Sequence, residues 1–198
     1  MNKRKIWAIL GLFALVFASC KNSGSSDTEE KDEASQSPAS KGISYSLVFT
    51  DSFRLVLNRY YDLKDAFVKS DTAAIRLTGL AMKEAVAVFS VKEVEAKDSL
   101  VYQAVQDKPE DLLKGVEELL KGKDIEKQRS SFEVISQAMY DLLQSLKPSG
   151  IHAYNQFCPM AFEDKGAYWL SAADSIMNPY FGKKMLHCGE VKEEFHFE

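Results

Sequence analysis

Apolar residues recur at helical spacing through the middle of the chain. In the first such stretch the apolar positions are separated by alternating steps of four and three residues, which places them on one face of a helix. These positions are Phe49, Phe53, Val56, Tyr60, Leu63 and Phe67. A second stretch follows Asp71, a good N-cap residue, and we expect small and medium side chains on its inward face. These are Ala74, Leu77, Ala81, Ala85 and Val88. The pattern predicts two consecutive amphipathic helices.

Two more helices are predicted before residue 150. Pro109 suits the first turn of a shorter helix, which Gly122 is placed to end. Its apolar positions are Leu112, Val116 and Leu119. Asp124 can cap the next helix, whose apolar face consists of Ile125, Phe132, Ile135, Met139, Leu142 and Leu146. Amphipathic helices joined by connections of modest length favour an antiparallel four-helix bundle, which we predict over residues 43–150.

Three side chains on these faces need comment. We expect Met82 and Met139 to fill space in the core, which is the usual role of methionine. Arg129 falls within the apolar face of its helix, where a charge needs a partner. We therefore expect its guanidinium to reach solvent or to pair with a carboxylate on a neighbouring helix.

Residues 151–198 differ in kind from the helical region. They hold nine aromatic residues, all three histidines and two of the three cysteines. An alternating pattern over Val191, Glu193, Phe195 and Phe197 indicates a short strand or hairpin. Asn178-Pro179 marks a tight loop. We predict a small irregular lobe with short strands, rich in cysteine and aromatic residues, packed on one end of the bundle.

The N-terminal segment has the features of an export signal. Lys3, Arg4 and Lys5 precede the uncharged run 6–18, which is too short to span a membrane as a helix. The sequence Phe-Ala-Ser-Cys ending at Cys20 is close to a bacterial lipobox, although phenylalanine replaces the usual leucine. We therefore predict a lipoprotein signal peptide over residues 1–19 and a lipid anchor on Cys20. The alternative is an ordinary signal peptide with an unmodified cysteine.

Residues 20–42 contain no large apolar side chain and hold a cluster of acidic residues. Such a segment cannot offset the entropy of its own ordering, and we predict a flexible acidic linker. Lys21 stands where an aspartate would signal retention in the inner membrane of many bacteria. We expect attachment to the outer membrane of the cell envelope, facing the periplasm, with display on the cell surface as the alternative.

Composition and motifs exclude several classes of protein. The chain has 198 residues, a formal charge of −4 and no basic stripe, which argues against nucleic-acid binding. It contains no HExxH, GxSxG or GxxxxGK[ST] motif. A cysteine nucleophile paired with His152 or His187 has no supporting motif either. We predict that the protein is not an enzyme.

Sulfur-containing residues suggest a metal site in the C-terminal lobe. Residues two apart in extended backbone point the same way, so Cys158 and Met160 could face one centre. Met185, His187 and Cys188 lie within four residues of one another. Thiolates and thioethers are soft donors that select Cu(I) or Ag(I). The predicted ligands are Cys158 and Cys188, completed by Met160, Met185 and His187, with Trp169 or Tyr168 shielding the site from water.

A disulfide between Cys158 and Cys188 is the main alternative. Exported proteins commonly oxidise such pairs, and closing a loop of about 30 residues would stabilise the fold by roughly 3 kcal/mol. The two methionines would then be core residues. A third alternative is a pair of free, buried thiols. On the disulfide hypothesis the protein is a non-catalytic structural or interaction lipoprotein.

Several sequence runs resemble the bacterial family catalogued as domain of unknown function 3347. They are DIEKQRSSF (124–132), CPMAF (158–162), GAYWLS (166–171), NPYFG (178–182) and MLHCGEVKE (185–193). The resemblance extends over residues 46–193. It implies a lipoprotein or secreted protein, with no enzymatic activity attached. It also implies a link to heavy-metal efflux, because the same domain is appended to efflux adaptors of the copper and silver type. We therefore expect a lipid-anchored envelope protein that binds Cu(I) in heavy-metal efflux or homeostasis, with a metal-efflux adaptor or pump as partner.

Overall fold

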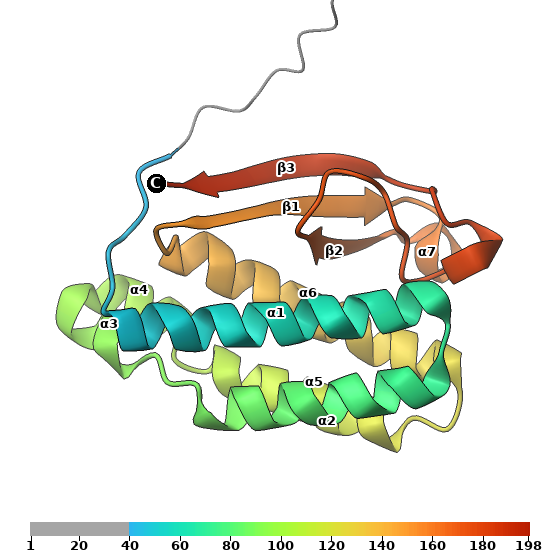
Figure 1. The fold of residues 1–198 in the computed structure, drawn as a ribbon, viewed down its shortest axis with the longest axis horizontal. Coiled ribbons are helices and arrows are strands. Elements are labelled where there is room, and N and C mark those ends of the chain that lie inside the picture. The colour runs from blue at the N-terminus through green and yellow to red at the C-terminus, as the bar shows by residue number, and fades with distance from the viewer. Residues whose placement is uncertain (1–39) are drawn as a thin grey trace, which may run out of the picture. The chain divides into compact units, whose positions relative to one another are not determined.

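A computed structural model describes residues 40–198 of the chain. The predicted signal peptide, Cys20 and most of the predicted linker lie outside these residues. In the part described, the helices are α1 (Leu47–Lys69), α2 (Thr72–Val88), α3 (Lys92–Lys97), α4 (Ser99–Val105), α5 (Lys108–Lys121), α6 (Ile125–Leu146) and the short α7 (Ala161–Asp164). The strands are β1 (Ile151–Cys158), β2 (Ala167–Ser171) and β3 (Glu190–Phe197), with a 3-10 turn η1 at Gly182–Lys184. The protein is mainly helical, with a small antiparallel sheet towards its C-terminus (Figure 1).

The N-caps predicted for α2 and α6 are confirmed. Asp71 precedes α2 and its carboxylate accepts hydrogen bonds from the amides of Ala73 and Ala74, both at 3.0 Å. Asp124 precedes α6 and accepts from the amide of Lys127 at 2.8 Å. These bonds satisfy amides that the first turn of a helix leaves without intrahelical partners.

The predicted core faces of α1 and α5 are confirmed, and that of α6 is confirmed except at Ile125. All six apolar positions of α1 are buried, as are Leu112, Val116 and Leu119 of α5. Phe53 and Phe132, expected at the centre of the core, are completely buried. Ile125 is only partly buried, because it lies in the first turn of α6, at the edge of the core.

The predicted inward face of α2 is wrong in part. Leu77 and Val88 are 70% and 74% exposed, and the buried residues are Ile75, Gly79, Met82, Ala85 and Val86. Small residues surround α2 on several sides, so spacing alone allows more than one apolar face. Gly79 decides the outcome, since a Cβ atom there would lie 3.2 Å from Leu120 Cδ2 of α5. The close approach of α2 to α5 therefore takes place on the side of Gly79.

Two short helices, α3 and α4, were not predicted. Each buries one valine, Val94 and Val105, and each is too short for a helical period to be recognised. Asp98 ends α3 and caps α4 by accepting from the amides of Leu100 and Val101. Both helices lie in the connection between α2 and α5.

The C-terminal region forms a three-stranded antiparallel sheet in the order β2-β1-β3. The predicted strand at Val191–Phe197 is confirmed by β3, whereas β1 and β2 were not predicted. The register of β1 against β3 shifts between Asn155 and Gln156, so the inward and outward alternation of β1 is broken there. That irregularity explains why β1 lacks a period-two pattern in the sequence.

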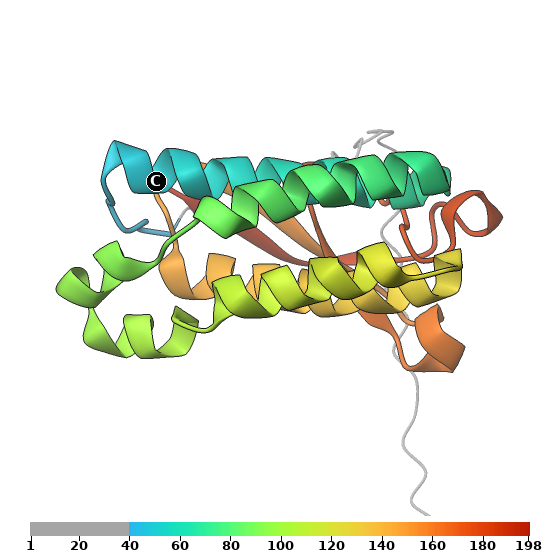
Figure 2. The ribbon, with the colours of Figure 1, turned by 90° about the horizontal axis from the view of Figure 1, so that it is seen from below.

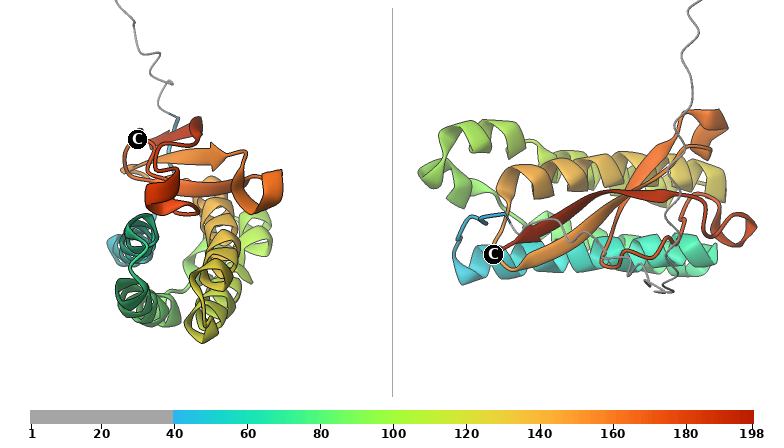
Figure 3. Two further views of the ribbon diagram at one scale, coloured as in Figure 1. Left: turned by 90° about the vertical axis from the view of Figure 1, so that its right-hand side faces the viewer. Right: turned by 90° about the horizontal axis from the view of Figure 1, so that it is seen from above.

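The sheet extends along the helices rather than covering one end of them. The views show it lying across α1 and α6, with α2 and α5 on the far side (Figures 1 and 3). Seen from below, α2 and α5 extend side by side along the molecule (Figure 2). Tyr60 of α1 joins the layers, because its hydroxyl pairs with Ser136 of α6 at 2.8 Å and accepts from the amide of Leu170 in β2 at 3.0 Å.

Arg129 is buried and its charge is paired, but not with a neighbouring helix as expected. Its guanidinium binds Glu126 on its own helix at 2.7 Å. Its other nitrogens donate to the Pro179 carbonyl and to the Ser70 hydroxyl, both at 3.1 Å. Arg129 thus ties α6 to the end of α1 and to the loop that follows β2.

The last residues of the predicted linker pair with the C-terminal strand. The amide of Ser40 donates to the backbone carbonyl of His196 at 2.9 Å, and the amide of Gly42 donates to the backbone carbonyl of Glu198 at 2.8 Å. Among residues 40–198, none of the helices has the length and apolar character that crossing a membrane requires.

Candidate metal centre

The fold brings Cys158 and Cys188 together. Their sulfur atoms are 2.8 Å apart, and both residues are free cysteines. Cys158 is completely buried at the end of β1, and Cys188 is partly exposed in the loop between η1 and β3. The two sulfur atoms therefore lie side by side, and solvent reaches them on the side of Cys188.

Strand pairing positions Cys158. It lies opposite Ala167 in the last register pair of β1 and β2. The turn between these strands has positive φ angles at Phe162, Glu163 and Asp164, so α7 is a left-handed turn rather than an ordinary helix. Side chains make such a backbone unfavourable, and it persists only where the surrounding structure imposes it. The chain thus reverses tightly just after Cys158.

Packing against the aromatic core positions Cys188. Its amide donates to the Met185 carbonyl at 3.1 Å, which closes a turn. Gly189 follows with φ of 146°, and a Cβ atom there would lie 2.9 Å from Trp169 Cη2 and 2.8 Å from the Phe157 carbonyl oxygen. Glycine is required because the chain enters β3 between these two groups.

The two methionines of the predicted site lie outside the hydrophobic core. Met160 is 46% exposed and Met185 is partly buried, whereas Met82 and Met139 are completely buried. Met160 is not in extended backbone, because β1 ends at Cys158 and Met160 has φ −87° and ψ −6°. The strand geometry expected for Met160 is therefore wrong.

The remaining predicted residues differ in their relation to the cysteine pair. His187 is exposed, and its Nδ1 lies 3.0 Å from the Ile176 carbonyl oxygen. Trp169 is buried next to Gly189, beside the cysteine pair. Tyr168 lies on the ring of Phe157, with centroids 4.4 Å apart, and is 42% exposed. Of the two aromatic side chains proposed as a shield, Trp169 is the one beside Cys188.

The electrostatic environment keeps Cys188 protonated at neutral pH. Its hydrogen bond with Cys158 raises the pKa of the Cys188 thiol to about 11, and partial burial adds to that effect. The Met160 N–H acts in the opposite direction. A soft metal ion would bind the thiolates and release their protons.

Hard or borderline ligands are not gathered near the pair. Among residues 40–198, no group of three or more His, Cys, Asp or Glu side chains is placed to hold a metal ion. The soft donors of this region are the two thiols and the thioethers of Met160 and Met185, which lie two and three residues away in the chain. Such a donor set suits Cu(I) or Ag(I) and does not suit Mg²⁺ or Ca²⁺.

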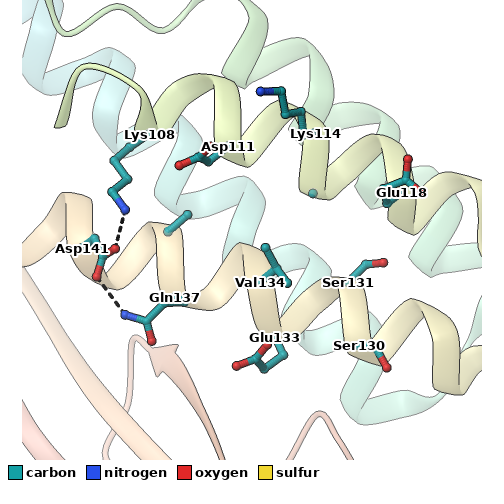
Figure 4. Close-up of a pocket in the computed structure, with 12 residues that line it drawn as sticks. Lys108, Asp111, Lys114, Glu118, Ser130, Ser131, Glu133, Val134, Gln137 and Asp141 are labelled. Atoms are coloured by element: carbon teal, nitrogen blue, oxygen red, sulfur yellow. Dashed lines mark hydrogen bonds and ion pairs between the residues drawn. The ribbon is translucent and has the colours of Figure 1, made fainter. Parts of the chain in front are cut away.

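An open groove on the other side of α6 does not add a reactive group. It lies between α5 and α6, with a volume of about 710 Å³. Figure 4 shows that Lys108 and Gln137 both reach Asp141, at 2.6 and 2.8 Å. Lys114 forms an ion pair with Glu110, and Glu118 forms one with Lys121. Most of its charged groups are thus partnered within the two helices.

Sequence analysis missed the part played by Asn178. Its buried side chain contacts the Cys188 carbonyl and two amides of its own loop. In the sequence, the Asn-Pro pair indicates only a turn. Nothing in the local pattern indicates a contact with a residue ten positions later.

Comparison with known proteins identifies a family for the helical part. Residues 56–150 match the family described as "Protein of unknown function (DUF3347)". The recognition made from sequence motifs is thereby confirmed, although the match covers only the first of the motifs quoted for it, residues 124–132. No curated protein and no solved structure matches the chain.

Proposed function

We propose that this DUF3347 protein binds a soft monovalent metal ion, Cu(I) or Ag(I), through the thiolates of Cys158 and Cys188. Met160 and Met185 complete the coordination. The observation that carries the proposal is the meeting of two thiols, thirty residues apart in the chain, at a partly exposed point. The protein acts as a binding protein and not as an enzyme.

The exposure of Met160 favours metal binding over a purely structural role. Methionines that only fill space are expected in the core, as Met82 and Met139 are. Met160 keeps 46% of its surface exposed, two residues after Cys158. The Met185 carbonyl accepts from the Cys188 amide at 3.1 Å, so Met185 lies one turn from that cysteine. Both thioethers are therefore carried by the segments that hold the thiols.

Metal binding requires a small opening of the pair. Two thiolates on one metal ion, each about 2.3 Å from it, are separated by about 4 Å. The sulfurs of Cys158 and Cys188 are 2.8 Å apart. Because Cys158 is fully buried in a paired strand and Cys188 is partly exposed, the sulfur that moves is that of Cys188, by rotation of its side chain on an unchanged backbone.

The cellular setting of the proposal comes from the N-terminal sequence and the family resemblance. A lipid on Cys20 would hold the protein at the outer membrane facing the periplasm. Copper must be bound and exported in that compartment, which is where a heavy-metal efflux adaptor or pump acts. The site is then a store or relay for the metal ion.

A disulfide is the second candidate, favoured by the same short separation. Sulfur atoms at 2.8 Å need little backbone movement to form a bond. In that case the lobe is a structural or interaction module, and the methionines have no role in coordination.

Anaerobic titration of the reduced full chain with Cu(I), against a competing chelator, distinguishes the candidates. We expect one Cu(I) per chain, loss of at least a hundredfold in affinity for Cys158→Ser or Cys188→Ser, and about tenfold for Met160→Leu. Met177→Leu is the matched control, since Met177 is partly buried in the same lobe but not in the proposed site. Failure of the reduced chain to compete for Cu(I) overturns the proposal. If Met160→Leu and Met177→Leu bind Cu(I) with equal affinity, Met160 is not a ligand.

We also propose that the long helices form one antiparallel four-helix bundle beneath the sheet. Three interfaces support it, those of α1 with α2, α2 with α5 and α5 with α6. The fourth side, between α1 and α6, is supported by the ring of Phe132, whose centroid lies 5.4 Å from that of Tyr60 and 4.8 Å from that of Phe67. An experimental structure with α1 and α6 apart would contradict it.

A further inference from the structure

We propose that Asn178 is a positioning residue that holds Cys188 against Cys158. The inference rests on the proposed function, because the position of Cys188 matters only if the two sulfurs act together. Asn178 does not touch a metal ion in this account. It acts through the backbone of the residue that does.

The side chain of Asn178 is completely buried and uses both ends of its amide. Its Nδ2 donates to the Cys188 carbonyl at 2.7 Å. Its Oδ1 accepts from the amides of Tyr180 and Phe181, at 2.8 and 3.2 Å. One side chain therefore closes its own turn and also binds the residue that carries the second thiol.

The backbone of Asn178 adds a second tie to the same loop. Its N–H donates to the Leu186 carbonyl at 2.8 Å. The loop from residue 178 to residue 188 is thus closed at two points, two residues apart. Cys188 is not in a strand or helix, so its place is defined by these bonds, by the bond of its own amide to the Met185 carbonyl and by the packing of Gly189 against Trp169.

The surroundings of Asn178 are themselves fixed. Pro179, next in the chain, has its carbonyl bound by buried Arg129 at 3.1 Å. The hydroxyl of Tyr180 donates to the Tyr168 carbonyl in β2 at 2.6 Å. Asn178 therefore connects Cys188 to a rigid support. The bond from its Nδ2 to the Cys188 carbonyl can be removed without changing the other contacts of the side chain.

Asn178→Asp removes that link selectively. An aspartate keeps an oxygen to accept from the amides of Tyr180 and Phe181 but has no N–H for the Cys188 carbonyl. It places a second oxygen against that carbonyl instead, which is repulsive in a buried setting. The turn at Asn178 is retained while Cys188 is released.

Gln156→Glu is the matched control. Gln156 is also completely buried in the same lobe, and its Nε2 donates to the carbonyls of Ala173, Asp174 and Ser175 at 2.9 to 3.3 Å. The change is again from amide to carboxylate, but the loop that loses its bonds carries neither cysteine.

The readout is the equilibrium of the full chain with glutathione. One glutathione disulfide is reduced to two glutathione molecules, while the thiols of Cys158 and Cys188 lose two protons and two electrons and become a disulfide. The equilibrium constant gives the effective concentration of one thiol at the other. We expect Asn178→Asp to lower this effective concentration at least tenfold and Gln156→Glu to change it less than twofold. A fall in Asn178→Asp no larger than that in Gln156→Glu overturns the inference.

A second variant and a Cu(I) affinity measurement complete the test. If Asn178→Asp does not fold, Asn178→Ser retains a short acceptor for the turn, but its hydroxyl is too short to replace Nδ2 at the Cys188 carbonyl, and the same result is expected. Cu(I) affinity is measured on the same variants and is expected to fall with the effective concentration. If the wild-type chain binds no Cu(I), the proposed function fails, whereas the glutathione comparison still decides the role of Asn178.

Discussion

At the scale of single residues, buried polar groups determine how the sheet and the helices meet. Tyr60 is the clearest case, since its hydroxyl joins α1 to Ser136 of α6 and to Leu170 of β2. Burial raises the pKa of Tyr60 well above its usual range, so the hydroxyl stays protonated and remains available as both donor and acceptor. Its periodic position predicted burial but not these partners.

Tyr60→Phe is expected to destabilise the protein by about 1–3 kcal/mol, because the Leu170 amide and the Ser136 hydroxyl lose a buried partner. Urea unfolding measures the change. Tyr102→Phe is the control: Tyr102 lies at the edge of the core and is only partly buried, so an effect below about 0.5 kcal/mol is expected. Equal effects of the two changes would contradict the role given to Tyr60.

At the scale of elements, sequence periodicity predicted helices well where one apolar face is unambiguous. In α1 the alternating spacing of large residues leaves a single choice of face. In α2 small residues allow several, and contact with α5 selects the one that contains Gly79. In β1 a register shift removes the alternation that would have indicated a strand.

The corrected face of α2 can be tested by truncation. Met82→Ala is expected to cost about 2–5 kcal/mol, because Met82 is completely buried in the core. Leu77→Ala is expected to cost less than about 0.5 kcal/mol, because Leu77 is 70% exposed. Denaturant midpoints of both variants provide the measurement. A larger loss of stability for Leu77→Ala than for Met82→Ala would instead support the inward position of Leu77 expected from the sequence.

The short helix α3 is tied to the start of α1 by Glu93. Its carboxylate accepts from the hydroxyl and the amide of Ser46, and these bonds, followed by the charge of Lys97, lower the pKa of Glu93. A lowered pKa in the folded state gives stability that is present above the unfolded pKa, near 4.5, and is lost as the pH falls through the folded value.

Comparing the wild-type chain with Glu93→Gln tests this contact. We expect the wild type to be more stable at pH 7, and the difference to shrink as the pH falls below about 4.5. Stability measured by urea unfolding at several pH values gives the result. A difference that does not change between pH 7 and pH 3 would show that the charge of Glu93 does not contribute.

At the scale of the whole molecule, the candidate site depends on contacts that sequence spacing does not contain. The meeting of Cys158 and Cys188 could be predicted, because soft donors cluster in the last 48 residues. The contacts that place the two cysteines could not be predicted, since Cys158 is positioned by pairing with Ala167 and Cys188 by Asn178 and by the packing of Gly189 on Trp169. Each of these contacts joins segments that are distant in the chain.

Anchoring is also a property of the whole molecule, and it is predicted from the sequence alone. Cys20→Ala is expected to move the protein from the membrane fraction to the soluble fraction, because the lipid attachment point is lost. Cys158→Ala is the matched control and should leave the protein in the membrane fraction. Retention of correctly processed Cys20→Ala in the membrane fraction would contradict the lipobox.

The most direct test of the central claim is X-ray absorption at the copper edge of the full chain loaded with one Cu(I). We expect a shell of sulfur atoms only, with short Cu–S distances of about 2.3 Å, and a smaller sulfur shell in Met160→Leu. A shell that contains nitrogen or oxygen ligands in place of sulfur, or one unchanged by Cys188→Ser, would contradict it.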